Sequence, residues 1–98
     1  MDKKIIWTKK AKEELFDILN YWKNRNKSNL FSLKLYELIE EQLQLILDFP
    51  EIGRPTDIPN VYVKVIQNYL LYFEFIDNTL YILTLRHRSR NPKTLKIR

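Results

Sequence analysis

The sequence has 98 residues and a mass of 12.0 kDa, which suits one domain over residues 1–98 and is too short for two independent cores. It contains no cysteine and one histidine, His87, so disulfides, thiolate nucleophiles and zinc sites built from Cys or His are excluded. It shows neither a signal-peptide core nor an apolar run of about 18 residues. We therefore expect a reduced, soluble, cytoplasmic domain that uses no metal and no cofactor.

The net charge of +5 comes from the C-terminal part of the chain. Residues 1–58 hold ten Lys or Arg and ten Asp or Glu, whereas residues 59–98 hold seven basic residues against Glu74 and Asp77. A cluster of one sign attracts polyanions or an acidic partner. A solvated, frayed terminus would carry the same charges, so both interpretations stay open on charge alone.

The first half of the chain predicts a strand followed by two helices. Residues 4–7 are apolar, β-branched and aromatic, which favours a short strand. Thr8 is a suitable N-cap for a helix over about residues 9–25, whose apolar residues recur at steps of three and four. A polar, turn-forming stretch follows, and a second amphipathic helix is expected over about 29–48, where Pro50 stops it. The short connection makes the two helices an antiparallel hairpin.

The second half predicts a β-meander after a loop over residues 49–60, which contains three prolines and Gly53, the only glycine. From residue 61 the apolar period changes to two, and strands are expected over 61–66, 69–76 and 79–86. If both connections are two-residue turns, Ile66 opposes Tyr69, and Tyr72 lies opposite Leu83. The predicted fold is therefore α+β in the order β-α-α-β-β-β, with the helical hairpin packed on one face of the antiparallel meander.

That register sorts the strand residues into two faces. One face collects Val61, Val63, Val65, Leu70, Tyr72, Leu83 and Leu85, and the other collects Tyr62, Lys64, Ile66, Tyr69, Leu71, Phe73, Phe75, Leu80, Ile82, Thr84 and Arg86. We expect the valine-rich face to lie under the helices, because a β-branched row packs well there. The second face is then expected to form an open, apolar groove with cations at one end, unless the C-terminal tail or a second copy covers it.

Three strings in this order resemble the RelE/ParE superfamily of toxins from bacterial toxin–antitoxin pairs. They are Phe49-Pro50-Glu51-Ile52-Gly53-Arg54-Pro55, then Asn68-Tyr69-Leu70-Leu71-Tyr72, then Ile82-Leu83-Thr84-Leu85-Arg86-His87-Arg88-Ser89-Arg90-Asn91-Pro92. The first and last strings are more similar to the ParE-like branch. In addition, an arginine that commonly stands ahead of the Leu-Leu-Tyr string in RelE-like sequences is replaced here by Tyr69.

The resemblance implies a toxin that a cognate antitoxin neutralises in a heteromeric complex. A ParE-like member would inhibit growth by binding DNA gyrase, whereas a RelE-like member would cleave mRNA on the ribosome without a metal. A basic nucleic-acid-binding domain without toxicity is a third hypothesis, based only on the charge of the C-terminal part.

Candidate site residues follow from these hypotheses. Cleavage through the 2′-hydroxyl needs a base, an acid and cations, for which the candidates are His87, Arg86, Lys64 and Tyr69. By strand alternation His87 points away from Arg86 and Lys64, and a histidine that only hydrogen-bonds backbone is the competing interpretation. Cations for a target are expected at Arg54, Arg86, Arg88 and Arg90. Antitoxin contacts are expected on the open face at Tyr62, Leu71, Phe73, Phe75 and Ile82. Tyr21, Trp22 and Tyr36 are interpreted as helix packing.

Overall fold

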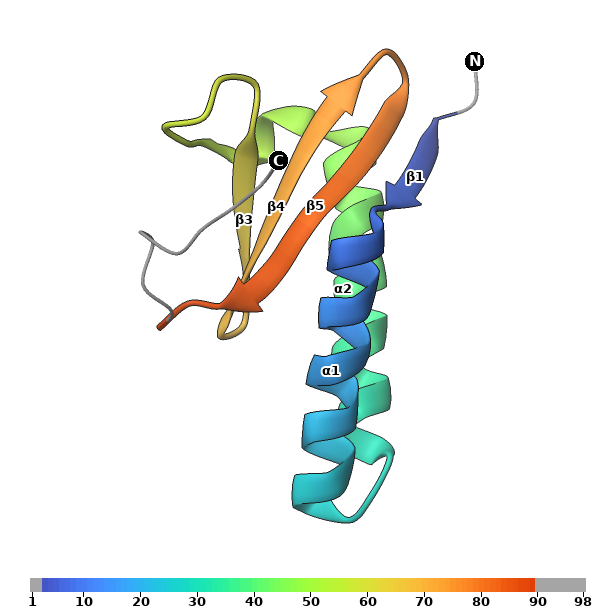
Figure 1. Cartoon of the computed structure of the whole chain (residues 1–98). Helices are drawn as coiled ribbons and strands as arrows, with labels where there is room; N and C mark the ends of the chain where they lie inside the picture. Colours follow the sequence, from blue (N-terminus) through green and yellow to red (C-terminus); the bar gives the residue numbers. More distant parts are fainter. Residues whose placement is uncertain (1–2, 90–98) are drawn as a thin grey trace.

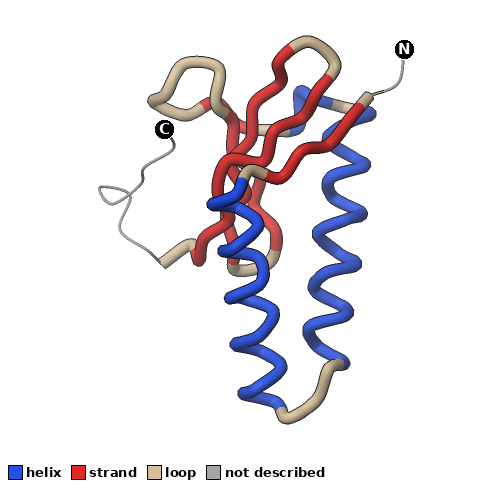
Figure 2. The backbone as a smooth tube through the Cα atoms, turned by 45° about the vertical axis from the view of Figure 1, so that its right-hand side comes forward, coloured by secondary structure: helices blue, strands red, loops and turns tan. Residues whose placement is uncertain are grey.

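A computed structural model of the chain describes residues 3–89 and contains two layers, a helical hairpin and a five-stranded sheet (Figures 1 and 2). The elements are β1 (Lys4–Trp7), α1 (Lys9–Asn26), α2 (Leu30–Asp48), a 3₁₀ turn (Pro50–Ile52), β2 (Arg54–Pro55), β3 (Tyr62–Ile66), β4 (Tyr69–Ile76) and β5 (Thr79–His87). The predicted α+β class and element order are confirmed. No helix in this part of the chain combines the length and apolar character needed to cross a bilayer.

Thr8 connects the helical hairpin to the sheet. Its Oγ1 accepts a hydrogen bond from the backbone N–H of Ala11 at 3.3 Å, which caps α1, and it donates to the carbonyl of Ile82 at 2.7 Å. At the same end of the hairpin, Lys3 Nζ donates to the Leu47 carbonyl at 2.6 Å, where the last carbonyls of α2 need partners. These contacts hold both helices against the sheet at the end where the chain enters the fold.

The sheet order is β1-β5-β4-β3-β2, with β1 parallel to β5 and all other pairs antiparallel. Both predicted two-residue turns are present, since Ile66 pairs with Tyr69 and Ile76 pairs with Thr79. The first residue of the second turn, Asp77, has a φ of 57°, in the left-handed region that such turns require. The predicted loop over residues 49–60 holds the 3₁₀ turn and β2, which adds an edge to the sheet.

The prediction of which face the helices cover is wrong. Leu71, Phe73 and Ile82 are fully buried in one cluster with Leu35 and Ile39 of α2, so the hairpin packs on their face. Val65, on the other face, is 38% exposed. The face with the larger apolar side chains is the buried one because burying Phe and Leu removes more apolar surface from water than burying Val.

The pairing of β4 and β5 also differs from the prediction at residues 69–72, the part of β4 that precedes Phe73. A β-bulge shifts the pairing, so that Phe73 opposes Ile82 while Tyr72 opposes Thr84, and Leu83 is the extra residue. All later residues of β5 therefore change faces relative to the uninterrupted alternation: Leu85 enters the helix-covered core and Arg86 pairs with Leu70.

The face away from the helices has a smaller cluster of its own. Val61, Tyr72 and Leu83 are buried there, with Ile58 from the loop packed against them. The bulge residue Leu83 thus lies on the same face as Tyr72. The predicted register, without a bulge, placed Leu83 on this face as well.

Candidate functional site

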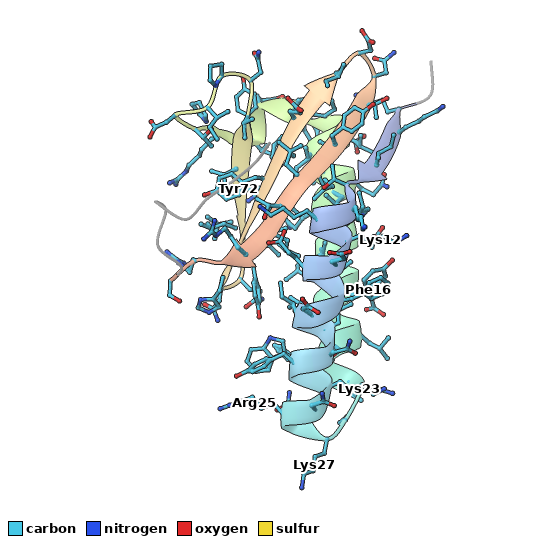
Figure 3. The ribbon with its side chains drawn as sticks, viewed as in Figure 1. Lys12, Phe16, Lys23, Arg25, Lys27 and Tyr72 are labelled. Carbon is cyan, nitrogen blue, oxygen red and sulfur yellow. The ribbon has the colours of Figure 1, made fainter. Side chains whose placement is uncertain are left out.

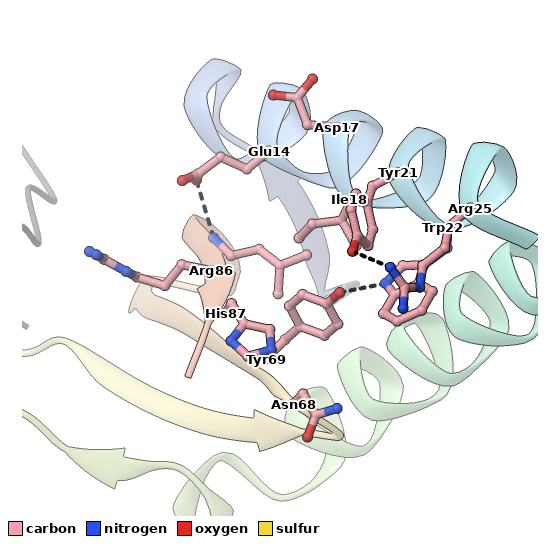
Figure 4. Close-up of a pocket in the computed structure, with 11 residues that line it drawn as sticks. Glu14, Asp17, Ile18, Tyr21, Trp22, Arg25, Asn68, Tyr69, Arg86 and His87 are labelled. Carbon is pink, nitrogen blue, oxygen red and sulfur yellow. Dashed lines mark hydrogen bonds between the residues drawn. The ribbon is translucent and has the colours of Figure 1, made fainter. Parts of the chain in front are cut away.

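The described residues form a groove between α1, the start of β4 and the end of β5 (Figure 4). We call it the Trp22 groove. It has a volume of about 510 Å³. Its lining residues are Glu14, Asp17, Ile18, Tyr21, Trp22, Arg25, Asn68, Tyr69, Leu85, Arg86 and His87.

Aromatic side chains form one wall of the groove in a fixed arrangement. The indole Nε1 of Trp22 donates to the Tyr69 hydroxyl at 2.6 Å, which joins α1 to β4. Trp22 also stacks on Phe31 of α2, with ring centroids 4.6 Å apart, and Tyr21 meets it edge-on at 5.1 Å. The His87 ring lies edge-on to Tyr69 at 5.5 Å. These contacts restrict the rotamers of Trp22 and Tyr69, so the wall is pre-organised to pack against an apolar or aromatic side chain.

Polar groups line the groove from α1 and from the strands. Glu14 Oε1 accepts from Thr84 Oγ1 at 2.6 Å and from the backbone N–H of Leu85 at 3.2 Å, directly after the bulge. Arg25 Nη1 donates to the Tyr21 hydroxyl at 3.4 Å. The groove thus combines an aromatic wall with charges of both signs at its rim. This combination suits a protein segment better than a polyanion.

Three of the four residues predicted for RNA cleavage, Tyr69, Arg86 and His87, line the Trp22 groove, whereas Lys64 does not. Arg86 pairs with Leu70 and His87 with Tyr69, so these two neighbours point to opposite faces of the sheet. Lys64 is on the face of His87 but two strands and two residues away, which places their Cα atoms about 12 Å apart. The separation of His87 from Arg86 agrees with the prediction, although the bulge has exchanged their faces.

Two of these candidates make hydrogen bonds to neighbouring groups of the chain. Tyr69 is buried and its hydroxyl accepts from Trp22. His87 Nδ1 accepts from the backbone N–H of Ser89 at 3.2 Å and lies 2.7 Å from its hydroxyl. A neutral His87 therefore carries its proton on Nε2. This is the local backbone contact that the competing interpretation of His87 predicted.

The cations predicted for a target do not gather at one place among the described residues. Arg54 lies on β2, three strands from β5, or about 14 Å across the sheet. Arg88 is exposed just after β5, whereas the Arg86 side chain is buried. Arg90 lies outside the described residues. Cation contacts with a target would therefore come from separate points rather than from one cluster.

The residues predicted for the antitoxin do not form an open face. Leu71, Phe73 and Ile82 lie under the helices, and Phe75 is half-buried against the same core. Tyr62 is 38% exposed and stacks on Phe73, with ring centroids 6.1 Å apart. The exposure on which this prediction depended is therefore corrected, because the helices occupy that face.

Tyr21 and Trp22 were not predicted as site residues, because both were interpreted as helix packing. Trp22 does pack between the helices, as interpreted, but one edge of it also lines the groove. Tyr21 is 54% exposed beside it. Two adjacent aromatic residues cannot both face the core of one helix, and this signal could have indicated a surface role for Tyr21. No group of three potential metal ligands occurs within residues 3–89.

Comparison with known proteins supplies the family. The model of the ParE toxin of the parDE type II toxin–antitoxin system matches residues 5–92. Among solved structures, the chromosomal ParDE toxin–antitoxin system from P. aeruginosa is similar with a TM-score of 0.74 and 21% identity, over 87% of this chain and 95% of that chain. The RelBE2 toxin–antitoxin complex from Mycobacterium tuberculosis is similar with a TM-score of 0.61 and 16% identity, over 90% of this chain and 100% of that chain. No curated protein matches.

Proposed function

Because the chain belongs to the ParE toxin family of type II toxin–antitoxin systems, we propose that it inhibits growth by binding DNA gyrase and that a cognate antitoxin holds it inactive. The observation that carries the choice of target is that the candidate catalytic groups do not all meet at one point. Transfer through a 2′-hydroxyl needs a base, an acid and cations around one phosphate. Tyr69, Arg86 and His87 line one groove, but Arg86 and His87 lie on opposite faces of β5, the Arg86 side chain is buried, and Lys64 is about 12 Å from His87.

A toxin that acts by protein contact needs no such constellation. Exposed basic residues such as Arg54 and Arg88 would then serve as contacts with gyrase, where a charge acts without a partner acid or base. The greater similarity to a ParDE system than to RelBE2 supports the same choice.

We place the antitoxin in the Trp22 groove. Both solved neighbours are toxin–antitoxin systems, which supports a protein partner for this chain. The groove offers a rigid aromatic wall with Tyr21 exposed on it, and charges of both signs at its rim. An amphipathic segment with one aromatic or aliphatic anchor would fit this combination, because the anchor would pack on surfaces that are already ordered.

A RelE-like ribonuclease remains the second candidate, and one observation favours it. His87 is exposed and stays next to an aromatic hydroxyl residue, Tyr69, at the edge of the groove. On the ribosome, bound mRNA would have to supply the phosphate next to these groups, and Arg25 and Arg86 are the cations that line the same groove.

Two purified assays distinguish the targets. We expect the chain to inhibit gyrase supercoiling and to leave mRNA intact in a reconstituted translation system. Arg88→Ala should weaken the inhibition, whereas Lys9→Ala, an exposed cation at the start of α1, should not. Ribosome-dependent transcript cleavage with unaffected supercoiling would contradict the gyrase proposal, and a loss of that cleavage in His87→Ala would establish the alternative.

The antitoxin site is tested with a matched pair of tyrosines. Tyr21→Ala should weaken antitoxin binding by roughly tenfold or more, since it removes an aromatic contact at the groove. Tyr62→Ala should leave the affinity nearly unchanged, because Tyr62 lies at the other end of the sheet. Equal losses in both variants, or a loss only in Tyr62→Ala, would refute the placement in the Trp22 groove.

A further inference from the structure

The side of the helical hairpin that faces away from the Trp22 groove exposes large apolar side chains. Phe16 of α1 is 53% exposed, and Leu33 and Tyr36 of α2 are 58% and 41% exposed. Phe16 and Tyr36 line a shared hollow of about 440 Å³. Figure 3 shows Phe16 projecting from the side of α1 opposite to Arg25, which lines the Trp22 groove. We call this surface the outer seam, defined by Lys12, Phe16, Leu33, Tyr36 and Glu40.

The two helices that border the outer seam carry opposite charge. Within α1 there are five basic and three acidic residues, and within α2 one basic and four acidic residues. On the seam itself, Lys12 lines the hollow from α1. On α2, Glu40 follows Tyr36 by four residues, which places it one turn along the same face of the helix, and its negative charge raises the pKa of Tyr36. One border of the seam is thus basic and the other acidic.

This arrangement is self-complementary about one particular two-fold axis. An axis parallel to the helices places α1 of one copy on α2 of the other, running antiparallel, so basic meets acidic. An axis across the helices places α1 on α1, so like charges meet. The charge distribution therefore selects the first arrangement, which is an isologous contact made twice by symmetry.

The heights of the seam residues along the helix axes are compatible with this two-fold axis. Phe16 and Tyr36 line the same hollow, so they lie at the same height. Lys12 is one turn from Phe16 toward the start of α1, and Glu40 is one turn from Tyr36 toward the end of α2. Because the helices are antiparallel, these turns extend in the same direction. Rotation about the parallel axis keeps each height and exchanges the helices.

We propose that two copies of this chain associate through the outer seam, with Phe16 packed on Tyr36 of the partner subunit and Lys12 paired with Glu40 of the partner subunit. Helices of 18 and 19 residues are about 27–29 Å long, and two of them side by side are about 20 Å wide. A footprint of that size is about 560 Å² per partner, which is below the standard value of about 800 Å² but, at about 1,100 Å² in total, above the roughly 1,000 Å² that a specific interface needs. The contact leaves the Trp22 groove open, so it is independent of the proposed antitoxin and gyrase contacts.

Sedimentation of the purified toxin over a range of concentrations tests the dimer. Wild type should show a concentration-dependent dimer, and Lys12→Glu or Glu40→Lys alone should raise the dimer dissociation constant roughly tenfold or more by placing like charges together. The combined variant Lys12→Glu, Glu40→Lys should restore association. Lys34→Glu is the matched control, because Lys34 lies beside a different hollow with Leu30 and Leu38. Circular dichroism verifies that each variant is folded.

Three results would overturn the proposal. The first is a wild type that stays monomeric at every concentration. The second is a combined variant that fails to reassociate although both single variants dissociate. The third is loss of antitoxin affinity in Phe16→Glu with no change in its oligomeric state, which would assign the outer seam to the antitoxin. None of these results bears on gyrase inhibition.

Discussion

A methyl group added at Gly53 should destabilise the protein through one residue, Phe73. A Cβ at Gly53 would overlap the Cζ atom of Phe73 and would stand 3.1 Å from both its Cε1 atom and the Cβ atom of Tyr62. Phe73 is fully buried and cannot swing aside without displacing the core. Gly53 has a φ of −75°, which alanine adopts freely, so the cost is steric and not conformational.

The magnitude follows from two opposing effects. Overpacking a well-packed core costs about 1–3 kcal/mol, whereas replacing glycine by alanine at a compatible φ stabilises by about 0.4–1 kcal/mol through the unfolded state. Gly53→Ala should therefore lower the free energy of unfolding by up to about 2.6 kcal/mol. In a Phe73→Leu background the overlapping ring tip is gone, so the same change should become neutral or stabilising.

Urea unfolding monitored by tryptophan fluorescence measures the four proteins of this double-mutant cycle. We expect a coupling energy of about 1–3 kcal/mol between the two sites, with unchanged m-values. Tyr62→Ala should give a smaller coupling, because the backbone-proximal Cβ atom that it retains is the atom in contact. Additive effects of Gly53→Ala and Phe73→Leu would refute the reasoning, since they would show that the Gly53 contact does not depend on the ring.

Three further predictions concern the groove and the seam. Glu14→Ala should lower the free energy of unfolding by about 1–3 kcal/mol, because it removes the acceptor of two hydrogen bonds beside the bulge. Glu14→Gln should lower it less, and denaturant titration measures both variants. Tyr69→Phe should cost about 1 kcal/mol by removing the acceptor of the Trp22 indole N–H, seen in denaturation and in a changed indole Nε1–H resonance. Glu40→Gln should lower the pKa of Tyr36 toward its usual value, because the negative charge that raises this pKa is removed. An NMR titration that follows the Cζ resonance of Tyr36 measures the pKa, and an unchanged pKa would contradict the prediction.

The local elements of this fold could be predicted from the sequence because their signals are local. Thr8 and Pro50 mark a helix start and a helix stop through groups within a few residues of themselves. The two-residue turns at Gln67 and Asp77 fixed the pairing next to each turn. Both first turn residues adopt a φ of 57° although neither is glycine, so the tertiary pairing of the strands overrides their intrinsic preference.

The choice of the buried face could not be predicted from propensity alone. Val63 and Val65 suit a strand by propensity, and this favoured their face as the floor for the helices. The competing quantity is the area of apolar surface removed from water, which is larger for Leu71 and Phe73 than for valines. The side-chain periodicity of a strand divides residues into two sets, but only packing against α2 decides which set is inside.

The groove depends on contacts between elements that are far apart in the sequence. Trp22 and Tyr69 are 47 residues apart and meet through a single hydrogen bond. Their pairing requires α1 to cross β5 at a particular height, which Glu14 sets by binding the strand at Thr84 and Leu85. No spacing rule along the chain contains this information, so a helical tryptophan was interpreted only as core.

The bulge at Leu83 shows why a matching string of residues does not transfer a site. In uninterrupted pairing Arg86 would share a face with Leu71, and His87 would point to the other side. One extra residue reverses this, and the reversal is stabilised because Leu85 gains a core position and Glu14 satisfies its N–H. Two chains of this family with the same Arg-His-Arg string would therefore present its cations to opposite faces if only one of them has the bulge. Relatives should therefore be compared first by the register of β4 and β5. The identity of the residues that follow the bulge is informative only after the register is known.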